Sequence, residues 1–161
     1  MGLYIKDTDI ELSNLFELNQ PLSPEIKNNI DNIDFIAIPS KYTDGSCYYA
    51  KESVNFIKYC RQKDFNHSYK LLDSGDVSEL SLHSFDIWMP IIWVSSNVLL
   101  PLAVSMAANY IHDRMKGREN EDAKVDMTFI IKSKGKNKSL HYNGDAKAFK
   151  KSFDKIDLNK M

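Results

Sequence analysis

The longest uncharged stretch of the chain runs from Ile87 to Ile111, 25 residues without a formal charge. A run of this length is sufficient to cross a bilayer. Two prolines and several polar side chains interrupt it, however, and each polar group would need an internal partner in lipid. The second half also has helical periodicity, with polar and apolar residues on opposite faces. The polar face comprises Ser105, Asn109, His112, Asp113 and Lys116, and the apolar face comprises Leu102, Ala103, Met106 and Tyr110.

This pattern predicts a buried strand at residues 91–94 followed by an amphipathic helix. Ser96 or Asn97 is suited to the N-cap, which places Pro101 in or next to the first turn, where its missing N–H costs little. Gly117 follows at the C-terminal cap position. We therefore favour a core strand and a core helix over a membrane span, and a membrane-anchored accessory protein held through residues 87–111 is the alternative.

The first half of the chain alternates between helical and strand patterns. A first helix is predicted after a cap at Asp7 or Thr8, and a second begins at Ser23. Residues 34–39 predict a buried strand, and residues 69–72 predict another. Between these strands lies a helix with an apolar inner stripe and a polar outer face. The stripe consists of Ala50, Val54, Ile57 and Cys60, and the outer residues are Lys51, Glu52, Lys58 and Arg61.

These elements form a β-α-β unit, which is typical of a parallel sheet. Residues 77–82 are expected to be a short helical or irregular piece. With the strand near residue 91 and the long helix, the prediction for residues 1–117 is an α/β domain built on a small three-stranded, mostly parallel sheet with helices.

The remaining residues, 118–161, are predicted to form a charged linker and a basic ββα unit. Apolar residues alternate in the first strand of a hairpin, the sequence SKGKNK forms its turn, and Ser139 begins the return. Asp145 then caps a final helix. Its apolar face, spaced three or four residues apart, comprises Ala146, Phe149, Phe153 and Ile156.

Composition indicates a globular chain: 43% of the 161 residues are apolar and the net charge is only −1. The charge is unevenly distributed, because residues 1–113 carry 8 basic and 15 acidic side chains, whereas residues 114–161 carry 13 and 7. Such asymmetry favours association with a protein partner or with further copies of the chain, and it leaves nucleic acid as an alternative partner. The first residues lack a secretory signal pattern, and the cysteines, Cys47 and Cys60, have no CxxC spacing. We expect a cytoplasmic protein with no metal and no cofactor.

Two polar loops follow the first two predicted strands, at the end of a parallel sheet where ligands usually bind. Their candidate ligand-binding residues are Ser40, Lys41, Thr43, Asp44, Gly45 and Ser46 in one loop, and Asp73 and Asp76 in the other. Neither loop matches a phosphate-binding fingerprint. Because Asp, Gly and Ser are also the usual residues of turns, ordinary loops are the favoured interpretation, with nucleotide sensing as an alternative.

No residue pattern predicts an enzyme. The four histidines stand apart from any nucleophile motif, and Cys60 lies on the inner stripe of its helix, where a core role is favoured. Lysines do cluster near the C-terminus, where they alternate along the hairpin and continue on the last helix. This candidate basic partner surface comprises Lys132, Lys134, Lys136, Lys138, Lys147, Lys150 and Lys151.

The order of elements in the second half resembles a known group of proteins. Residues 86–90 (DIWMP), Leu100-Pro101, residues 109–116 (NYIHDRMK), a charged linker and a ββα tail follow one another. This succession resembles small bacterial proteins of multi-gene conflict or defence clusters, including the effector-associated constant components. The resemblance covers about the last half of the chain and supplies no site residues. It implies a non-enzymatic adaptor or regulatory subunit that binds a protein partner in a bacterial multi-protein system.

Overall fold

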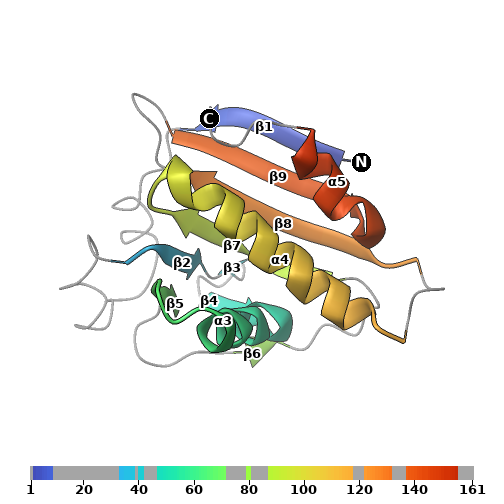
Figure 1. Ribbon diagram of the computed structural model, residues 1–161, viewed down its shortest axis with the longest axis horizontal. Coiled ribbons are helices and arrows are strands. Elements are labelled where there is room, and N and C mark those ends of the chain that lie inside the picture. The colour runs from blue at the N-terminus through green and yellow to red at the C-terminus, as the bar shows by residue number, and fades with distance from the viewer. Residues whose placement is uncertain are drawn as a thin grey trace.

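The computed structural model describes residues 2–8, 33–38, 40–41, 47–71, 79–80, 87–117, 122–131 and 137–155. The larger of two sheets consists of β1 (Gly2–Thr8), β2 (Phe35–Ile38), β5 (Tyr69–Leu71), β7 (Ile87–Val94), β8 (Lys124–Ile131) and β9 (Asn137–Asp145). These six strands lie in the order β1-β9-β8-β7-β2-β5. The helices are α3 (Lys51–Lys63), α4 (Leu100–Met115) and α5 (Phe149–Asp154), and the 3-10 turns are η2 (Asn97–Leu99) and η3 (Ala146–Ala148). In Figure 1, α4 and α5 lie across one face of the larger sheet.

The predicted β-α-β unit is confirmed. β2 and β5 pair in parallel, with Phe35 opposite Tyr69, and α3 connects them. The inner stripe of α3 is confirmed for Val54, Ile57 and Cys60, which are all buried, whereas Ala50 lies in the strand that precedes the helix. The outward position predicted for Glu52 is wrong, because its side chain is only 15% exposed.

The uncharged run at residues 87–111 forms β7, η2 and most of α4, which confirms the predicted strand and helix. The predicted polar face of α4 is exposed, and Pro101 lies in its first turn. β7 begins earlier than predicted and includes Pro90, which has no N–H to contribute to a ladder. The pairing register with β8 shifts between Trp88 and Ile91, so the irregularity coincides with the proline. None of the helices that the structure describes is long and apolar enough to cross a membrane.

The prediction of a small three-stranded, mostly parallel sheet was wrong in size and in direction. β7 pairs antiparallel to β2, with Ile36 opposite Trp93. On its other side β7 pairs in parallel with β8, and α4 makes the crossover between them. The predicted hairpin of β8 and β9 is confirmed, and this pairing adds it to the same sheet. A domain boundary at residue 117 stays a prediction.

In two places the structure has strands that were not predicted. Asp7 and Thr8, predicted to cap a first helix, are the last residues of β1, which pairs antiparallel with β9 along its whole length. Part of residues 77–82 is extended, because β6 (Glu79–Leu80) pairs in parallel with β4 (Cys47–Ala50). β4 also pairs with β3 (Ser40–Lys41), which gives a second sheet in the order β3-β4-β6. The helices predicted after residue 8 and at Ser23 lie outside the described residues.

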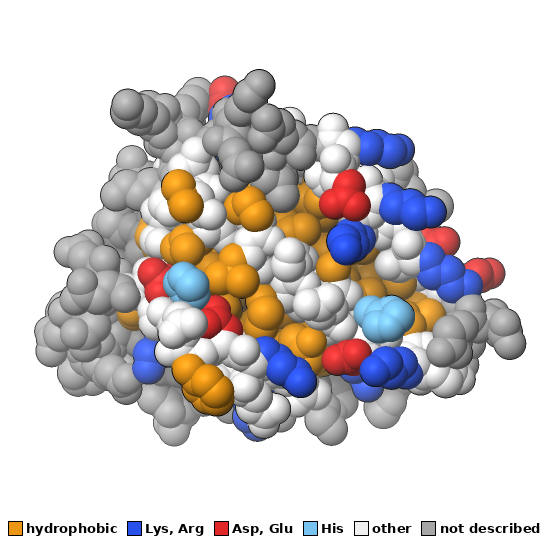
Figure 2. All heavy atoms as spheres, viewed as in Figure 1, with side chains coloured by type: hydrophobic (Ala, Val, Ile, Leu, Met, Phe, Trp, Pro, Cys, Tyr) orange, Lys and Arg blue, Asp and Glu red, His pale blue; other side chains and the backbone are white. Residues whose placement is uncertain are grey.

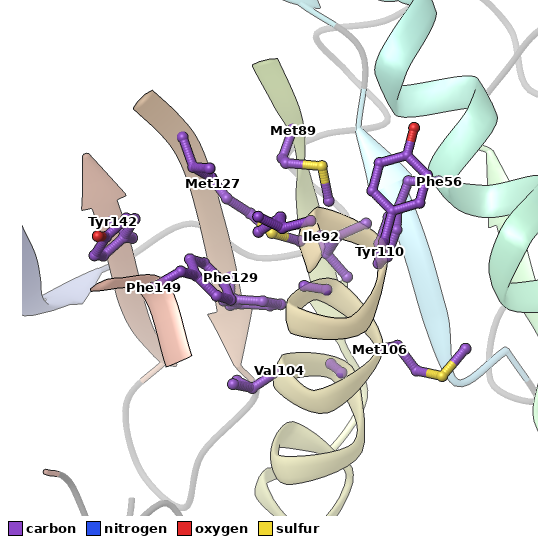
Figure 3. Packing of buried hydrophobic residues seen from close by; sticks show 14 of the residues in the cluster. Phe56, Met89, Ile92, Val104, Met106, Tyr110, Met127, Phe129, Tyr142 and Phe149 are labelled. Carbon is purple, nitrogen blue, oxygen red and sulfur yellow. The ribbon is translucent and has the colours of Figure 1, made fainter. Parts of the chain in front are cut away.

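The core lies between the larger sheet and its helices. In Figure 3, Met127 and Phe129 of β8 extend toward the helices, and Phe149 of α5 lies near Tyr142 of β9. The Phe129 and Phe153 rings meet edge to face at 5.7 Å, a geometry that aromatic pairs prefer. Alternate side chains of β8 and β9 therefore anchor α5, as the predicted apolar face of this helix requires.

The face of the larger sheet that lies opposite the helices is apolar at one end and polar at the other. Near β2 and β7 it is apolar, with Ile36, Ile38 and Trp93 buried outside the core cluster. Toward β1 it becomes polar, because the residues of β8 and β9 that alternate with the core are hydrophilic except Ile130, which is buried opposite Ser139. This polar end of the sheet carries the candidate site.

Candidate functional site

The ligand-binding loops predicted from the sequence are only partly described. Ser40 and Lys41 form β3, whose main chain pairs with residues 47–48 of β4. The other candidate residues lie outside the described part of the chain: Thr43, Asp44, Gly45, Ser46, Asp73 and Asp76. A ligand site in these loops stays a prediction.

The basic surface is described in its second half. Lys138 lies in β9 between Ile131 of β8 and Asp7 of β1. Exposed lysines follow on the helical tail, with Lys147 in η3 and Lys150 and Lys151 in α5. Figure 2 shows Lys and Arg side chains gathered over α5 at the upper right. Lys132, Lys134 and Lys136 lie outside the described residues, so their predicted alignment on one face stays untested.

The β1 edge, defined as the outer side of residues 2–8, is a feature that the sequence analysis missed. β1 is the terminal strand of its sheet, and no strand in the described part of the chain pairs with its outer side. Tyr4 is 55% exposed and Ile5 is 43% exposed. Because successive residues of a strand point to opposite faces, this edge presents an apolar side chain on each face. An edge of this kind is suited to pairing with another strand.

A hollow of about 480 Å³ opens on the polar face of the sheet, beside the β1 edge. The register places its residues in two rows across the strands. Tyr4, His141 and Thr128 form one row, and Lys6 and Ser139 form the next. Ser139 and Thr128 are short and lie among longer side chains, which accounts for the depression. Ser139 is buried on its floor.

The charges around the hollow are asymmetric. Lys6 lines it, and no acidic residue is among the described residues that do. Asp126 lies just beyond, and its Oδ1 is 3.1 Å from Nε2 of His141. An ionised carboxylate only accepts hydrogen bonds, so Nε2–H donates and the contact orients the ring. The Tyr4 and His141 rings are 6.5 Å apart between centroids. The hollow therefore combines a cation, hydroxyl groups and aromatic surface.

Sequence reasoning missed the hollow because its residues come from both ends of the chain. His141 stands alone in the sequence, and its partner Asp126 lies on the neighbouring strand of the hairpin. The signal that was available is the alternation of Ser139, His141 and Asn143 with the apolar residues of the same strand. The residues that β1 adds to the hollow could not be recognised from the sequence, because they depend on the pairing of β1 with β9.

A second polar cluster lies at the other edge of the sheet, in the turn between α3 and β5. Oδ2 of Asp64 accepts a hydrogen bond from the Tyr69 hydroxyl at 2.7 Å and lies 2.9 Å from Nδ1 of His67. Burial acts to raise the pKa of Asp64, but hydrogen bonds from Tyr69, the Asn66 main chain and His67 outweigh it and hold the pKa below its usual value. All these contacts are local, so the cluster has the character of a structural turn.

A third polar cluster joins α3 to α4. Glu52 accepts a hydrogen bond from the Tyr110 hydroxyl, and Nε of Arg114 lies 2.7 Å from its Oε1. Burial, followed by this hydrogen bond, raises the pKa of Tyr110. The three side chains come from facing helices and satisfy one another, so we assign them to packing.

Metal and thiol chemistry receive no support from the described residues. Three or more His, Cys, Asp or Glu side chains do not gather there in a metal-binding arrangement. Cys60 is fully buried, which confirms its core position, and burial raises the pKa of its thiol to about 12. The side chain of Cys47 is not described.

Comparisons of this chain with family models, curated proteins and solved structures found no match. The β1 edge and the hollow are therefore the features of this chain from which a function can be inferred.

Proposed function

We propose that this protein is a non-enzymatic adaptor that binds a protein partner by pairing the β1 edge with an extended, acidic segment of that partner. In this mode of recognition, main-chain hydrogen bonds supply affinity and alternate side chains supply specificity. The observation that carries the proposal is an edge strand of seven residues with two adjacent, exposed apolar side chains.

The exposure of Tyr4 and Ile5 supports this reading more than isolated surface residues would. Single exposed hydrophobic residues are common and need no explanation. Natural edge strands are usually protected by charge, proline or a bulge, and here the charged residues Lys6 and Asp7 follow two exposed apolar positions, Tyr4 and Ile5. A strand added beside β1 would cover Tyr4 on one face and Ile5 on the other.

The surrounding charge supports an acidic partner. Lys6 lies in β1 itself, and Lys138 is opposite Asp7 in β9. α5 packs against β1 and carries Lys150 and Lys151. Charges at the rim of an interface mainly accelerate association and select partners. We therefore expect the partner segment to carry Asp or Glu beside its apolar residues, and its binding to weaken with salt.

The biological setting of this adaptor is proposed from the sequence. The resemblance of the second half to accessory components of bacterial conflict and defence clusters supports a role as a subunit of a multi-protein system. The free thiol of Cys60 is in keeping with a reducing compartment, so we propose the cytoplasm.

The test compares two variants that each replace an exposed apolar side chain with lysine. Ile5→Lys alters the β1 edge, whereas Phe65→Lys alters the turn after α3, where Phe65 is 88% exposed. A partner is isolated from host cells with the wild-type chain, and its affinity for all three proteins is measured. We expect Ile5→Lys to weaken binding at least about tenfold, as at a central interface residue.

Phe65→Lys should bind like the wild type. Equal binding by Ile5→Lys, or equal loss in both variants, would refute the β1 edge as the contact. Circular dichroism of each variant establishes that it is folded.

Nucleic acid is the alternative partner, and the same purified wild-type chain can be tested for it. Submicromolar binding of DNA or RNA at physiological salt, lost on neutralising Lys132, Lys134, Lys136 and Lys138, would replace the protein-partner proposal. Such binding would fall steeply with salt, by about one counterion for each phosphate neutralised.

A further inference from the structure

We infer that the hollow on the polar face of the sheet is a binding site for a small phosphate monoester. The hollow shares Tyr4 and Lys6 with the β1 edge, but it opens on one face of the sheet and does not include Ile5, which lies on the other face, so the two proposals are tested with different probes and variants. Either proposal can fail without the other.

The size of the hollow indicates a small organic molecule. Sites for small molecules commonly enclose about 300–1,000 Å³, and this hollow, at about 480 Å³, lies within that range. A single inorganic ion would leave most of the volume to water, because one water molecule occupies about 30 Å³. The hollow therefore has room for a ligand larger than its charged group.

The donors indicate a phosphate as the charged group. The Lys6 ammonium group is a compact charge with three N–H donors, and the hydroxyl groups of Ser139 and Thr128 also donate. A phosphate accepts hydrogen bonds through several oxygens in different directions, which suits donors on separate strands. A planar carboxylate is most often recognised by the fork of an arginine, and the hollow has none among its described residues.

The rings indicate where the organic part lies. Tyr4 and His141 occupy the row next to Lys6 and Ser139, about two residues along each strand. Rows separated by two residues lie about 7 Å apart. A phosphate held between Lys6 and Ser139 would therefore place its ester group over Tyr4 and His141. Asp126 orients His141 from outside the hollow, so its carboxylate does not compete for the phosphate position.

The experiment titrates the full chain with inorganic phosphate, ribose 5-phosphate and adenosine 5′-monophosphate, each read by NMR. Ribose and adenosine are the matched uncharged probes. We expect shifts confined to the amides of residues around Tyr4, Lys6, Thr128, Ser139 and His141. Both esters should bind at least about tenfold more tightly than their uncharged counterparts, and inorganic phosphate should compete with them.

Variants locate the site. Lys6→Met keeps the length of the side chain but removes its charge, and it should weaken ester binding about tenfold or more. Ser139→Val fills the floor of the hollow and should have a comparable effect. Lys150→Met makes the same change as Lys6→Met on exposed α5 and should bind the esters normally.

Three results would overturn the inference. The first is that neither inorganic phosphate nor either ester binds at 10 mM or below, on the order of the weakest specific affinities. The second is that ribose and adenosine bind as tightly as their phosphate esters. The third is that Lys6→Met and Lys150→Met lose ester binding equally. The first two concern the wild-type chain, so they hold even if a variant fails to fold.

Discussion

Glu52 shows how a single carboxylate can hold two helices together. Its side chain is 15% exposed and contacts both Tyr110 and Arg114 across the interface between α3 and α4. The helical pattern of α3 predicted an outward position for this residue. Tyr110 and Arg114 approach it from α4, and a pattern within one helix contains no information about the helix that packs against it.

We predict that Glu52→Ala lowers the free energy of unfolding by about 1–3 kcal/mol, because it leaves the Tyr110 hydroxyl without its acceptor. Lys58→Ala, at an exposed position of the same helix, should change stability by less than about 0.5 kcal/mol. Urea unfolding followed by circular dichroism compares them. Equal stability of the two variants would show that the Glu52 contacts contribute nothing.

Cys60 should be chemically inert in the folded protein. Burial raises the pKa of its thiol to about 12, so almost no reactive thiolate is present near neutral pH. We predict that iodoacetamide at pH 8 leaves Cys60 unmodified in the native chain and labels it in denaturant, as read by peptide mass spectrometry. Rapid labelling without denaturant would contradict the buried position.

The raised pKa of the Cys60 thiol also affects the stability of the protein at alkaline pH. The thiol stays protonated in the folded chain to about pH 12, whereas in the unfolded chain it ionises from about pH 9. The stability that Cys60 contributes is therefore present below pH 9 and is lost as the pH rises toward 12. Cys60→Ala should reduce this alkaline loss of stability.

Among the elements, β9 and the turn that follows it depend on one glycine. Gly144 is buried, and a Cβ at this position would lie 3.1 Å from the Tyr142 hydroxyl oxygen and 3.6 Å from the main-chain nitrogen of Gly2. The Tyr142 hydroxyl donates a hydrogen bond to the carbonyl of Asp145, the residue that caps η3. The absence of a side chain at Gly144 thus permits both the pairing with β1 and the start of the terminal helix.

Gly144→Ala should destabilise the protein by about 1–3 kcal/mol, as is typical of overpacking beside a buried side chain. Asn143→Ala, at the exposed neighbouring position, serves as the control. Thermal unfolding of both variants provides the measurement. If Gly144→Ala melted at the wild-type temperature, the close approach of Tyr142 would not be a constraint.

The elements that local pattern determines could be predicted from the sequence. The inner stripe of α3, the polar face of α4 and the alternation in β8 each depend on residues within one segment, and these were found. The predicted N-cap of α4 was wrong, because Leu99 occupies that position and Ser96 precedes η2. β1 could not be identified in this way, because Asp7 and Thr8 also suit a helix cap and the partner strand lies near the other end of the chain. A short strand is specified by its pairing more than by its own sequence.

At the scale of the whole molecule, the sheet brings the two ends of the chain together. β1 pairs with β9, and β8 pairs with β7, so segments from both predicted parts contribute to six adjacent strands. This arrangement depends on register between distant segments, which periodicity does not encode. The hollow and the β1 edge both arise from it, which is why the sequence predicted neither.

The central claim is that a partner strand pairs with the β1 edge, and hydrogen–deuterium exchange tests it most directly. In the isolated chain, the amides of β1 that face β9 should exchange slowly and those on its outer side should exchange quickly. In the complex with the isolated partner, we predict that the outer amides of residues 3–8 become protected. Unchanged exchange throughout β1, with new protection confined to another part of the chain, would contradict the account.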